Sequence, residues 1–268
     1  AFKDWSNKPP LQRARIMFKF KELIEKNADE LTKLIVSEHG KVYEDAKGSL
    51  TRGLEVVEFA CGIPQMLKGE FTENVGSNVD SWSVRQPLGV CAGITPFNFP
   101  LNLVAHKVGP AIAAGNAVLL KPASDTPLSA LKLVEILLEA GLPPQAIACV
   151  TGSGSELGAA ICEDQRVRKI SFTGSAEVGL SITRAAGLKR ITMELGSNSP
   201  VIVLDDADLE KVASTLAVTG YANSGQVCIS SQRVIATAGC HDDLTDALLS
   251  KVSKLNAGDQ LIEETDIG

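Results

Sequence analysis

Apolar residues recur at helical spacing along the first quarter of the chain. Between residues 9 and 37 they follow one another at intervals of about three or four, which predicts a helix with one core-facing stripe. Pro9 and Pro10 mark its start, and the segment Asn27–Asp29 predicts a break with a new cap. The pattern continues over residues 41–67, so residues 1–68 are expected to form a helical N-terminal part.

The pattern changes to a period of two over residues 69–87. Phe71, Thr72 and Glu73 alternate apolar and polar side chains, and residues 79–85 repeat that alternation. Such alternation is typical of strands, and two strands this close together predict a hairpin. Because the segment separates two regions rich in helices, we expect it to project from the body as an arm.

From Leu88 onwards, short apolar runs alternate with segments of helical spacing. The apolar runs have the length of strands that are buried on both faces. Strand–helix alternation predicts an α/β fold in which a parallel sheet carries flanking helices on both faces, with ligands bound at the carboxyl ends of the strands. The expected strands are residues 89–95, 117–121, 146–151, 167–173, 190–195 and 201–204, and the expected helices are residues 101–114, 127–140, 155–163 and 178–187.

Composition and charge narrow the classes of partner. The chain has 268 residues and a net charge of -6, and it shows no basic face that could neutralise a nucleic acid. No apolar run is long enough to cross a bilayer, so we expect no membrane partner. The six cysteines form no CxxC pair and the three histidines have no ligand-like spacing, which indicates reduced thiols, a cytoplasmic protein and no metal site.

Two polar side chains follow the first two expected strands. Asn98 lies between Pro96 and Pro100, so its amide could point at a developing oxyanion or bond to its own turn. Lys121 ends the second strand, where it could reach a ribose hydroxyl or a phosphate, or face solvent. These residues alone leave both alternatives open at each position.

Glycine-containing turns follow the third and fourth expected strands. The segment Gly152–Gly158 has the spacing GxGxxxG, and the segment Phe172–Ser175 opens another helix. Backbone N–H groups at a helix N-terminus bind phosphate groups, so each turn could receive part of a pyrophosphate. One such turn is a weak signal, but two in succession favour a dinucleotide site.

Glu194 and Cys228 complete the set of candidate reactive side chains. Glu194 follows the fifth strand, where a partly buried carboxylate would have a raised pKa and serve as a general base, unless a salt bridge holds it. Cys228 lies in a turn of small residues and would be a nucleophile if a helix N-terminus or nearby donors stabilised its thiolate. Taken alone, Cys228 is better explained as a small buried hydrophobe.

In this order, the motifs resemble those of the aldehyde dehydrogenase superfamily over nearly the whole chain. The resemblance implies that Cys228 attacks an aldehyde to give a thiohemiacetal, whose oxyanion is held by the Asn98 amide and the Cys228 backbone N–H. It also implies that Glu194 activates the water that hydrolyses the resulting thioester. The ordered set that carries the resemblance is Pro96–Pro100, Lys121–Ala123, Gly152–Gly158, Phe172–Ser175, Glu194–Gly196 and Gly225–Cys228.

The resemblance further implies an NAD or NADP cofactor, a small aldehyde substrate, and a homodimer or homotetramer joined through the arm of residues 69–87. Residues 1–68 and 88–195 would form the Rossmann-like cofactor-binding domain, and residues 196–268 the first part of a second, catalytic α/β domain. Lys121 would bond to the adenosine ribose, and Val178 would pack on the adenine. The implied cofactor-binding residues are Thr95, Pro96, Phe97, Lys121, Ala123, Ser124, Gly154, Gly158, Phe172, Thr173, Gly174, Ser175, Val178 and Leu195.

Several features depart from the family pattern. Ser124 stands where NAD-selective members often carry a glutamate, so the serine leaves room for NADP. Residues 58–100 look closest to the methylmalonate-semialdehyde branch, which transfers the acyl group to coenzyme A, and residues 101–235 resemble a branch acting on lactaldehyde or phosphonoacetaldehyde. Glu194 favours hydrolysis over transfer to coenzyme A. The family's chain begins earlier and continues past Gly268, so a truncated, catalytically incomplete nucleotide-binding piece is a further alternative.

Overall fold

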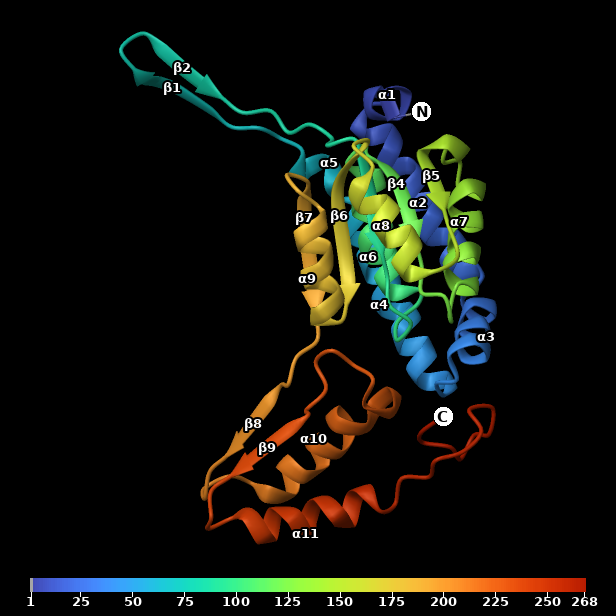
Figure 1. The fold of residues 1–268 in the computed structure, drawn as a ribbon, viewed down its shortest axis with the longest axis vertical. Coiled ribbons are helices and arrows are strands. Elements are labelled where there is room, and N and C mark those ends of the chain that lie inside the picture. The colour runs from blue at the N-terminus through green and yellow to red at the C-terminus, as the bar shows by residue number, and fades with distance from the viewer. Residues whose placement is uncertain (1) are drawn as a thin grey trace.

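A computed structural model describes residues 2–268 of the chain. Its centre is a five-stranded sheet with the order β5-β4-β3-β6-β7, in which all neighbouring strands run parallel (Figure 1). The chain builds the sheet outward from β3 in one direction and from β6 in the other, so the direction of winding changes between these two strands. The strands are β3 (Val90–Ile94), β4 (Ala117–Lys121), β5 (Ile147–Cys149), β6 (Val167–Gly174) and β7 (Arg190–Leu195).

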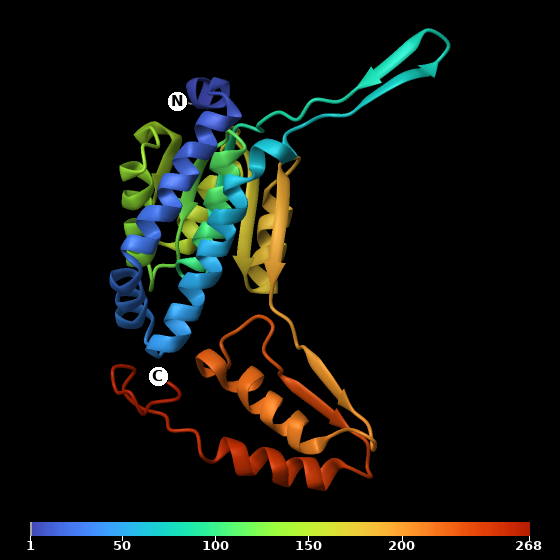
Figure 2. The same ribbon diagram turned by 180° about the vertical axis from the view of Figure 1, so that it is seen from behind.

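Helices cover both faces of this sheet, which confirms the predicted α/β fold. On one face α6 (Asn102–Ala113) and α7 (Leu128–Glu139) pack on β3, β4 and β5, with α2 (Pro10–Lys26) and α4 (Tyr43–Cys61) outside them (Figure 2). On the other face α8 (Gly154–Glu163) and α9 (Ala176–Ala185) pack on β6 and β7. Figure 2 also shows that no helix covers β6 and β7 on its side of the sheet. As a result, most of the edge strand β7 is exposed.

The N-terminal part is helical, as predicted, and packs into the largest core. The expected break is confirmed, because α3 (Ala28–His39) begins one residue after Asn27. A further short helix, α1 (Phe2–Asn7), was not predicted; its Trp5 is buried and donates an indole hydrogen bond to the Ile112 carbonyl at 3.0 Å. Two more short elements are α5 (Ile63–Met66), which follows α4, and the 3₁₀ turn η1 (Pro144–Ala146), which precedes β5.

The predicted hairpin is confirmed and projects from the body (Figure 1). Its antiparallel strands are β1 (Phe71–Gly76) and β2 (Val79–Trp82), and every residue of both strands is exposed. Phe71 is 66% exposed and Trp82 70%, so apolar side chains that a folded body would bury face solvent on this arm.

The C-terminal part has a small sheet of its own, beyond the carboxyl edge of the main sheet (Figure 1). The expected strand at residues 201–204 is confirmed as β8 (Pro200–Val203), but it pairs with β9 (Arg233–Ala236) and not with the main sheet. Two helices, α10 (Leu209–Tyr221) and α11 (His241–Val252), pack together beside β8 and β9, and α10 leads into the 3₁₀ turn η2 (Ala222–Gly225). Among residues 2–268, no helix is both long and apolar enough to span a bilayer.

Candidate active site

A cleft of about 390 Å³ lies where the carboxyl ends of β6 and β7 meet the loop after β3 and the turn that carries Cys228. Parallel strands bring their carboxyl ends to one edge, so residues far apart in sequence converge here. The three candidate catalytic residues, Asn98, Glu194 and Cys228, all line this cleft. The remaining lining residues are Pro96, Phe97, Thr173, Gly174, Ser175, Leu195, Gly196, Ser197, Gly225, Gln226, Val227 and Gln232.

Cys228 occupies a tight turn at the cleft and is exposed. The turn is closed by the Ser230 N–H, which donates to the Val227 carbonyl at 3.0 Å. The alternative that Cys228 is a buried packing residue is therefore wrong. No helix begins directly after this turn, since the next regular element is strand β9, but Ser175 at the N-terminus of α9 lines the same cleft.

Asn98 is tied to the cysteine turn by its side chain. Its Nδ2 donates to the Gln226 carbonyl at 2.8 Å, so the alternative of an asparagine bonded only within its own turn is wrong. This bond uses one of the two hydrogens of the amide. Among residues 2–268, Nδ2 makes no second hydrogen bond.

Glu194 lies at the end of β7 and is exposed, so the partly buried position expected for this carboxylate is wrong. The physical reason is that β7 is an edge strand without a helix on one face. The expected alternative of a salt bridge is not observed either, since Glu194 forms no ion pair with any residue of the range 2–268.

Lys107 of α6 is a polar group near the site that sequence reasoning missed. Its Nζ donates to Thr173 Oγ1 at 2.8 Å and to Ser171 Oγ at 3.2 Å. Burial lowers the pKa of Lys107 to about 8, and the Glu194 carboxylate opposes that shift. The available signal was a lysine in a largely apolar helix, because such a side chain must reach either solvent or partners across the sheet.

Two glycine-containing turns open helices at the same edge of the sheet. Ser153 caps α8, with its Oγ accepting from the Glu156 N–H at 3.4 Å, and Ser175 caps α9, accepting from the Val178 N–H at 3.3 Å. The N-terminal N–H groups and the helix dipoles make both turns suited to phosphate oxygens.

Lys121 and Ser124 lie beside the first glycine turn. A Cβ placed on Gly154 would sit 3.9 Å from Lys121 Nζ, and Ser124 Oγ donates to the Gly152 carbonyl at 2.9 Å. Burial lowers the pKa of Lys121, and Asp125 opposes that shift. The solvated alternative for Lys121 is wrong, because its side chain is only 4% exposed. Ala123 lies between these two residues and is half-buried.

Not every predicted cofactor residue reaches the cleft. Phe172 does not line it, because its ring packs in the core behind Gly174 and is 5% exposed. Thr95 is also buried, and its Oγ1 has no hydrogen-bond partner among the described residues. Gly158 has open space around its Cα, and Val178 is 48% exposed on the first turn of α9.

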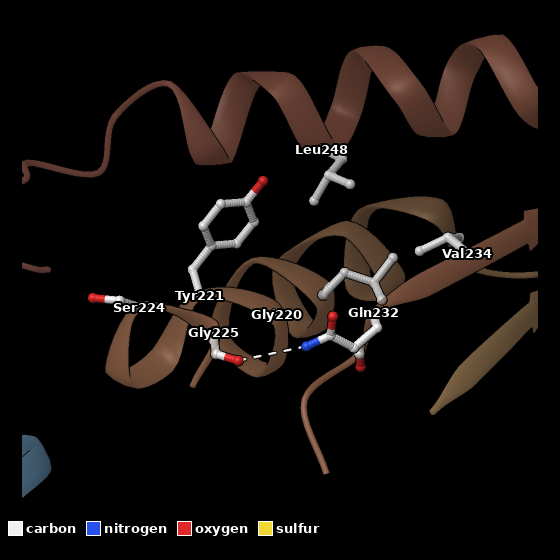
Figure 3. A pocket seen from close by; sticks show the side chains of 9 residues that line it. Gly220, Tyr221, Ser224, Gly225, Gln232, Val234 and Leu248 are labelled. Atoms are coloured by element: carbon white, nitrogen blue, oxygen red, sulfur yellow. Dashed lines mark hydrogen bonds between the residues drawn. The ribbon is translucent and has the colours of Figure 1, made fainter. Parts of the chain in front are cut away.

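A second cavity, of about 460 Å³, is lined in part by Ser224 and Gly225 of the segment that leads to Cys228 (Figure 3). This cavity is lined by Tyr221 and Leu248, which come from α10 and α11, and by Val234 of β9. Gly225 and Gln232 line both cavities, and Gln232 Nε2 donates to the Gly225 carbonyl at 3.5 Å, as the dashed line shows. Among residues 2–268, no group of three or more acidic, histidine or cysteine side chains could hold a metal ion.

Comparison with known proteins decides the family. The model of the aldehyde dehydrogenase family matches residues 1–268. The chain belongs to the aldehyde dehydrogenase family. A curated relative, the 3-sulfolactaldehyde dehydrogenase of Priestia aryabhattai, is 41% identical over 263 residues, which is 97% of this chain and 55% of the relative. The chain therefore spans about half the length of the curated relatives it matches.

Solved structures of the family have the same fold and hold nicotinamide cofactors. A Sinorhizobium meliloti protein, assigned as a methylmalonate-semialdehyde dehydrogenase and solved with NAD, is 37% identical with a TM-score of 0.96, over 100% of this chain and 55% of its own. The glyceraldehyde-3-phosphate dehydrogenase of Methanocaldococcus jannaschii, solved with NADP, is 34% identical with a TM-score of 0.96, over 100% of this chain and 59% of its own. The Rossmann-like architecture and the family resemblance are thereby confirmed.

Proposed function

We propose that the protein oxidises a small aldehyde to a carboxylic acid with NAD or NADP, and that Cys228 carries the acyl group during the reaction. The observation that supports this most directly is the cleft itself. It gathers an exposed thiol, an amide donor and a carboxylate from three segments of the chain. A nucleophile, an oxyanion donor and a base for water are the three groups that such a reaction requires.

The thiolate of Cys228 forms a bond to the carbonyl carbon of the aldehyde and gives a thiohemiacetal. The free hydrogen of the Asn98 amide, together with the Cys228 backbone N–H, stabilises the oxyanion, a type of contact that contributes about 100- to 1000-fold to a rate. Loss of hydride from the same carbon leaves a thioester. The Glu194 carboxylate takes a proton from water, the hydroxide attacks the thioester, and the acid and the Cys228 thiolate are released.

When bound, NAD or NADP would accept this hydride. The residues present fit such a group, because two capped helix N-termini face the edge at which the ammonium of Lys121 lies over the first glycine turn. We assign Lys121 to the ribose, Gly154 and Ser175 to the pyrophosphate, and Val178 to the adenine. Pro96, Phe97, Thr173, Gly174 and Leu195 would line the nicotinamide end, and Thr95, Ala123, Ser124, Gly158 and Phe172 would support the site from behind or from its rim.

The proposal also covers the organisation of the whole protein. We assign residues 1–68 and 88–195 to the cofactor-binding domain and residues 196–268 to part of the catalytic domain. The arm of residues 69–87 would join a second copy in a homodimer or homotetramer, which agrees with the exposure of its Phe71 and Trp82 side chains.

The experiment is a comparison of rapid and steady-state kinetics of the complete gene product with a panel of small aldehydes. Wild type should reduce NAD or NADP continuously, and Cys228→Ala should not. Glu194→Gln should give one equivalent of reduced cofactor in a burst and then turn over slowly, since it forms the thioester but hydrolyses it poorly. Unchanged steady turnover in both variants would contradict the proposal. Stimulation of turnover by coenzyme A, with an acyl-coenzyme A product, would replace hydrolysis with acyl transfer.

A further inference from the structure

The connection between α3 and α4 lies against the loop that follows β3. Its Lys41 is 2% exposed, and the Nζ donates to the backbone carbonyl of Asn98 at 2.7 Å. The same ammonium lies 4.3 Å from the centre of the Phe99 ring, which is within the range of a cation–π contact. Lys41 therefore holds two consecutive residues of the loop after β3, and one of them is the proposed oxyanion donor.

Burial of the Lys41 ammonium is energetically unfavourable. No carboxylate among residues 2–268 forms an ion pair with it, and the nearest negative charge that acts on it, Asp45, offsets its burial only in part. A buried ammonium without a close counter-ion destabilises a fold relative to an apolar side chain of the same length. Its presence is better explained by a task at the site than by stability.

Asp45, in the first turn of α4, contacts the turn that carries Cys228. Its Oδ2 accepts from the backbone N–H of Asn223 at 2.9 Å. Asn223 and Ser224 have φ values of 52° and 58°, which non-glycine residues rarely adopt, so this backbone needs outside contacts to hold it. Asn223 Nδ2 in turn donates to the Gln226 carbonyl at 3.2 Å, and that carbonyl also accepts from Asn98.

The contacts of Lys41, between α3 and α4, and of Asp45, in α4, form one network that reaches the proposed reacting groups. We propose that Lys41 and Asp45 are positioning residues that hold the Asn98 amide and the Cys228 turn in one frame, so that the donor and the nucleophile face the same carbonyl carbon. The proposal rests on the proposed function, because it assigns a role in the same reaction. It adds two residues from the N-terminal helical part, 57 and 178 positions away from the groups they hold.

The test for Lys41 is a double-mutant cycle on the complete gene product. Lys41→Met keeps the length of the side chain and removes the donor and the charge. It should lower kcat about 10-fold or more, because a displaced oxyanion donor loses much of its effect, and it should leave the KM for the cofactor within about 2-fold. In an Asn98→Ala background the same substitution should cost less than about 2-fold, since the group it positions is already gone. Lys33→Met, at an exposed lysine of α3, is the matched control.

Additive losses in the cycle would overturn the proposal, because a residue that only supports the fold lowers the activity of both backgrounds equally. Lys41→Arg keeps the charge and can keep the ring contact, so it should recover more kcat than Lys41→Met, although its larger planar head must fit a site where Lys41 is only 2% exposed. If Lys41→Met does not fold, the network is tested with two variants of Asp45. Asp45→Asn keeps an oxygen that can accept from Asn223 and should keep kcat, whereas Asp45→Ala should lose about 10-fold. Equal activity of these two variants would reject the network.

Failure of this proposal can be told apart from failure of the proposed function. If wild type oxidises aldehydes and Cys228→Ala does not, the reaction stands whatever Lys41→Met does. If wild type shows no aldehyde-dependent reduction of either cofactor, the proposed function is rejected and with it the role of Lys41.

Discussion

The buried charge of Lys41 is expected to lower the stability of the fold, although the same side chain is expected to support activity. Burial lowers the pKa of Lys41 to about 8 from an ordinary value of 10.5, with Asp45 acting in the other direction. In the unfolded chain the ammonium is solvated and keeps its ordinary pKa. Below about pH 8 the lysine is charged in both states, and the folded state carries the full cost of burying it.

The size of this cost follows from the two pKa values. Each pH unit between them corresponds to about 1.4 kcal/mol, so the charged lysine destabilises the fold by about 3 kcal/mol. As the pH rises from about 8 towards 10.5, the folded state releases the proton while the unfolded chain keeps it, and the fold gains stability. Between about pH 7 and pH 9.5 this gain amounts to about 2 kcal/mol. Lys41→Met removes the titrating group, so it should be at least as stable as wild type at neutral pH.

The assay is urea unfolding of wild type and Lys41→Met at those two pH values. The fluorescence of Trp5, which is 1% exposed, should report the transition, because unfolding moves this indole into water. The stability difference between the two proteins should shift in favour of wild type by about 2 kcal/mol at the higher pH. The exposed-lysine variant Lys33→Met should show no such shift. A pH-independent difference would refute the reasoning, because it would mean that the Lys41 ammonium is solvated in the folded state.

Two further predictions concern other contacts of the site and its scaffold. Glu38 accepts hydrogen bonds from the Leu128 and Ser129 N–H groups, at 2.7 and 2.9 Å, at the start of α7. Glu38→Ala should therefore lower the free energy of unfolding, measured by urea titration, by about 1–2 kcal/mol. Glu38→Gln keeps an acceptor and should lower it by less. Ser124→Glu should weaken NADP binding relative to NAD by about 10-fold or more in fluorescence titrations, because a carboxylate there repels a 2′-phosphate; an unchanged ratio would place the 2′-position elsewhere.

The main elements of the fold and the members of the site could be predicted from local patterns. Each expected strand of four to seven residues is a strand in the structure, Asn98 follows the first of them, and Glu194 lies at the end of the fifth. Parallel strands then bring their ends together by topology alone. Local patterns therefore place Asn98 and Glu194 at one edge of the sheet, whereas the choice of Cys228 as nucleophile came from the family resemblance of the ordered motifs.

The supporting groups could not be predicted, because they act across long distances in sequence. Lys41 was expected at the start of the helical pattern of residues 41–67, and nothing local shows that it points at Asn98. The exposure of Glu194 was missed for a related reason. Whether a strand end is covered depends on which strand lies at the edge of the sheet, and here β7 does. Which sheet β8 joins depends in the same way on its partner strand, β9, which no local pattern predicted.

The most direct test of the central claim is to trap the acyl group on the protein. Glu194→Gln would be mixed with an aldehyde and NAD or NADP, quenched in acid within the burst and digested with trypsin. Mass spectrometry should find the acyl mass on the peptide of residues 212–233, at Cys228, and not in samples without cofactor. Formation of reduced cofactor with no acyl mass on this peptide, or with the mass on another residue, would contradict the assignment of Cys228 as the nucleophile.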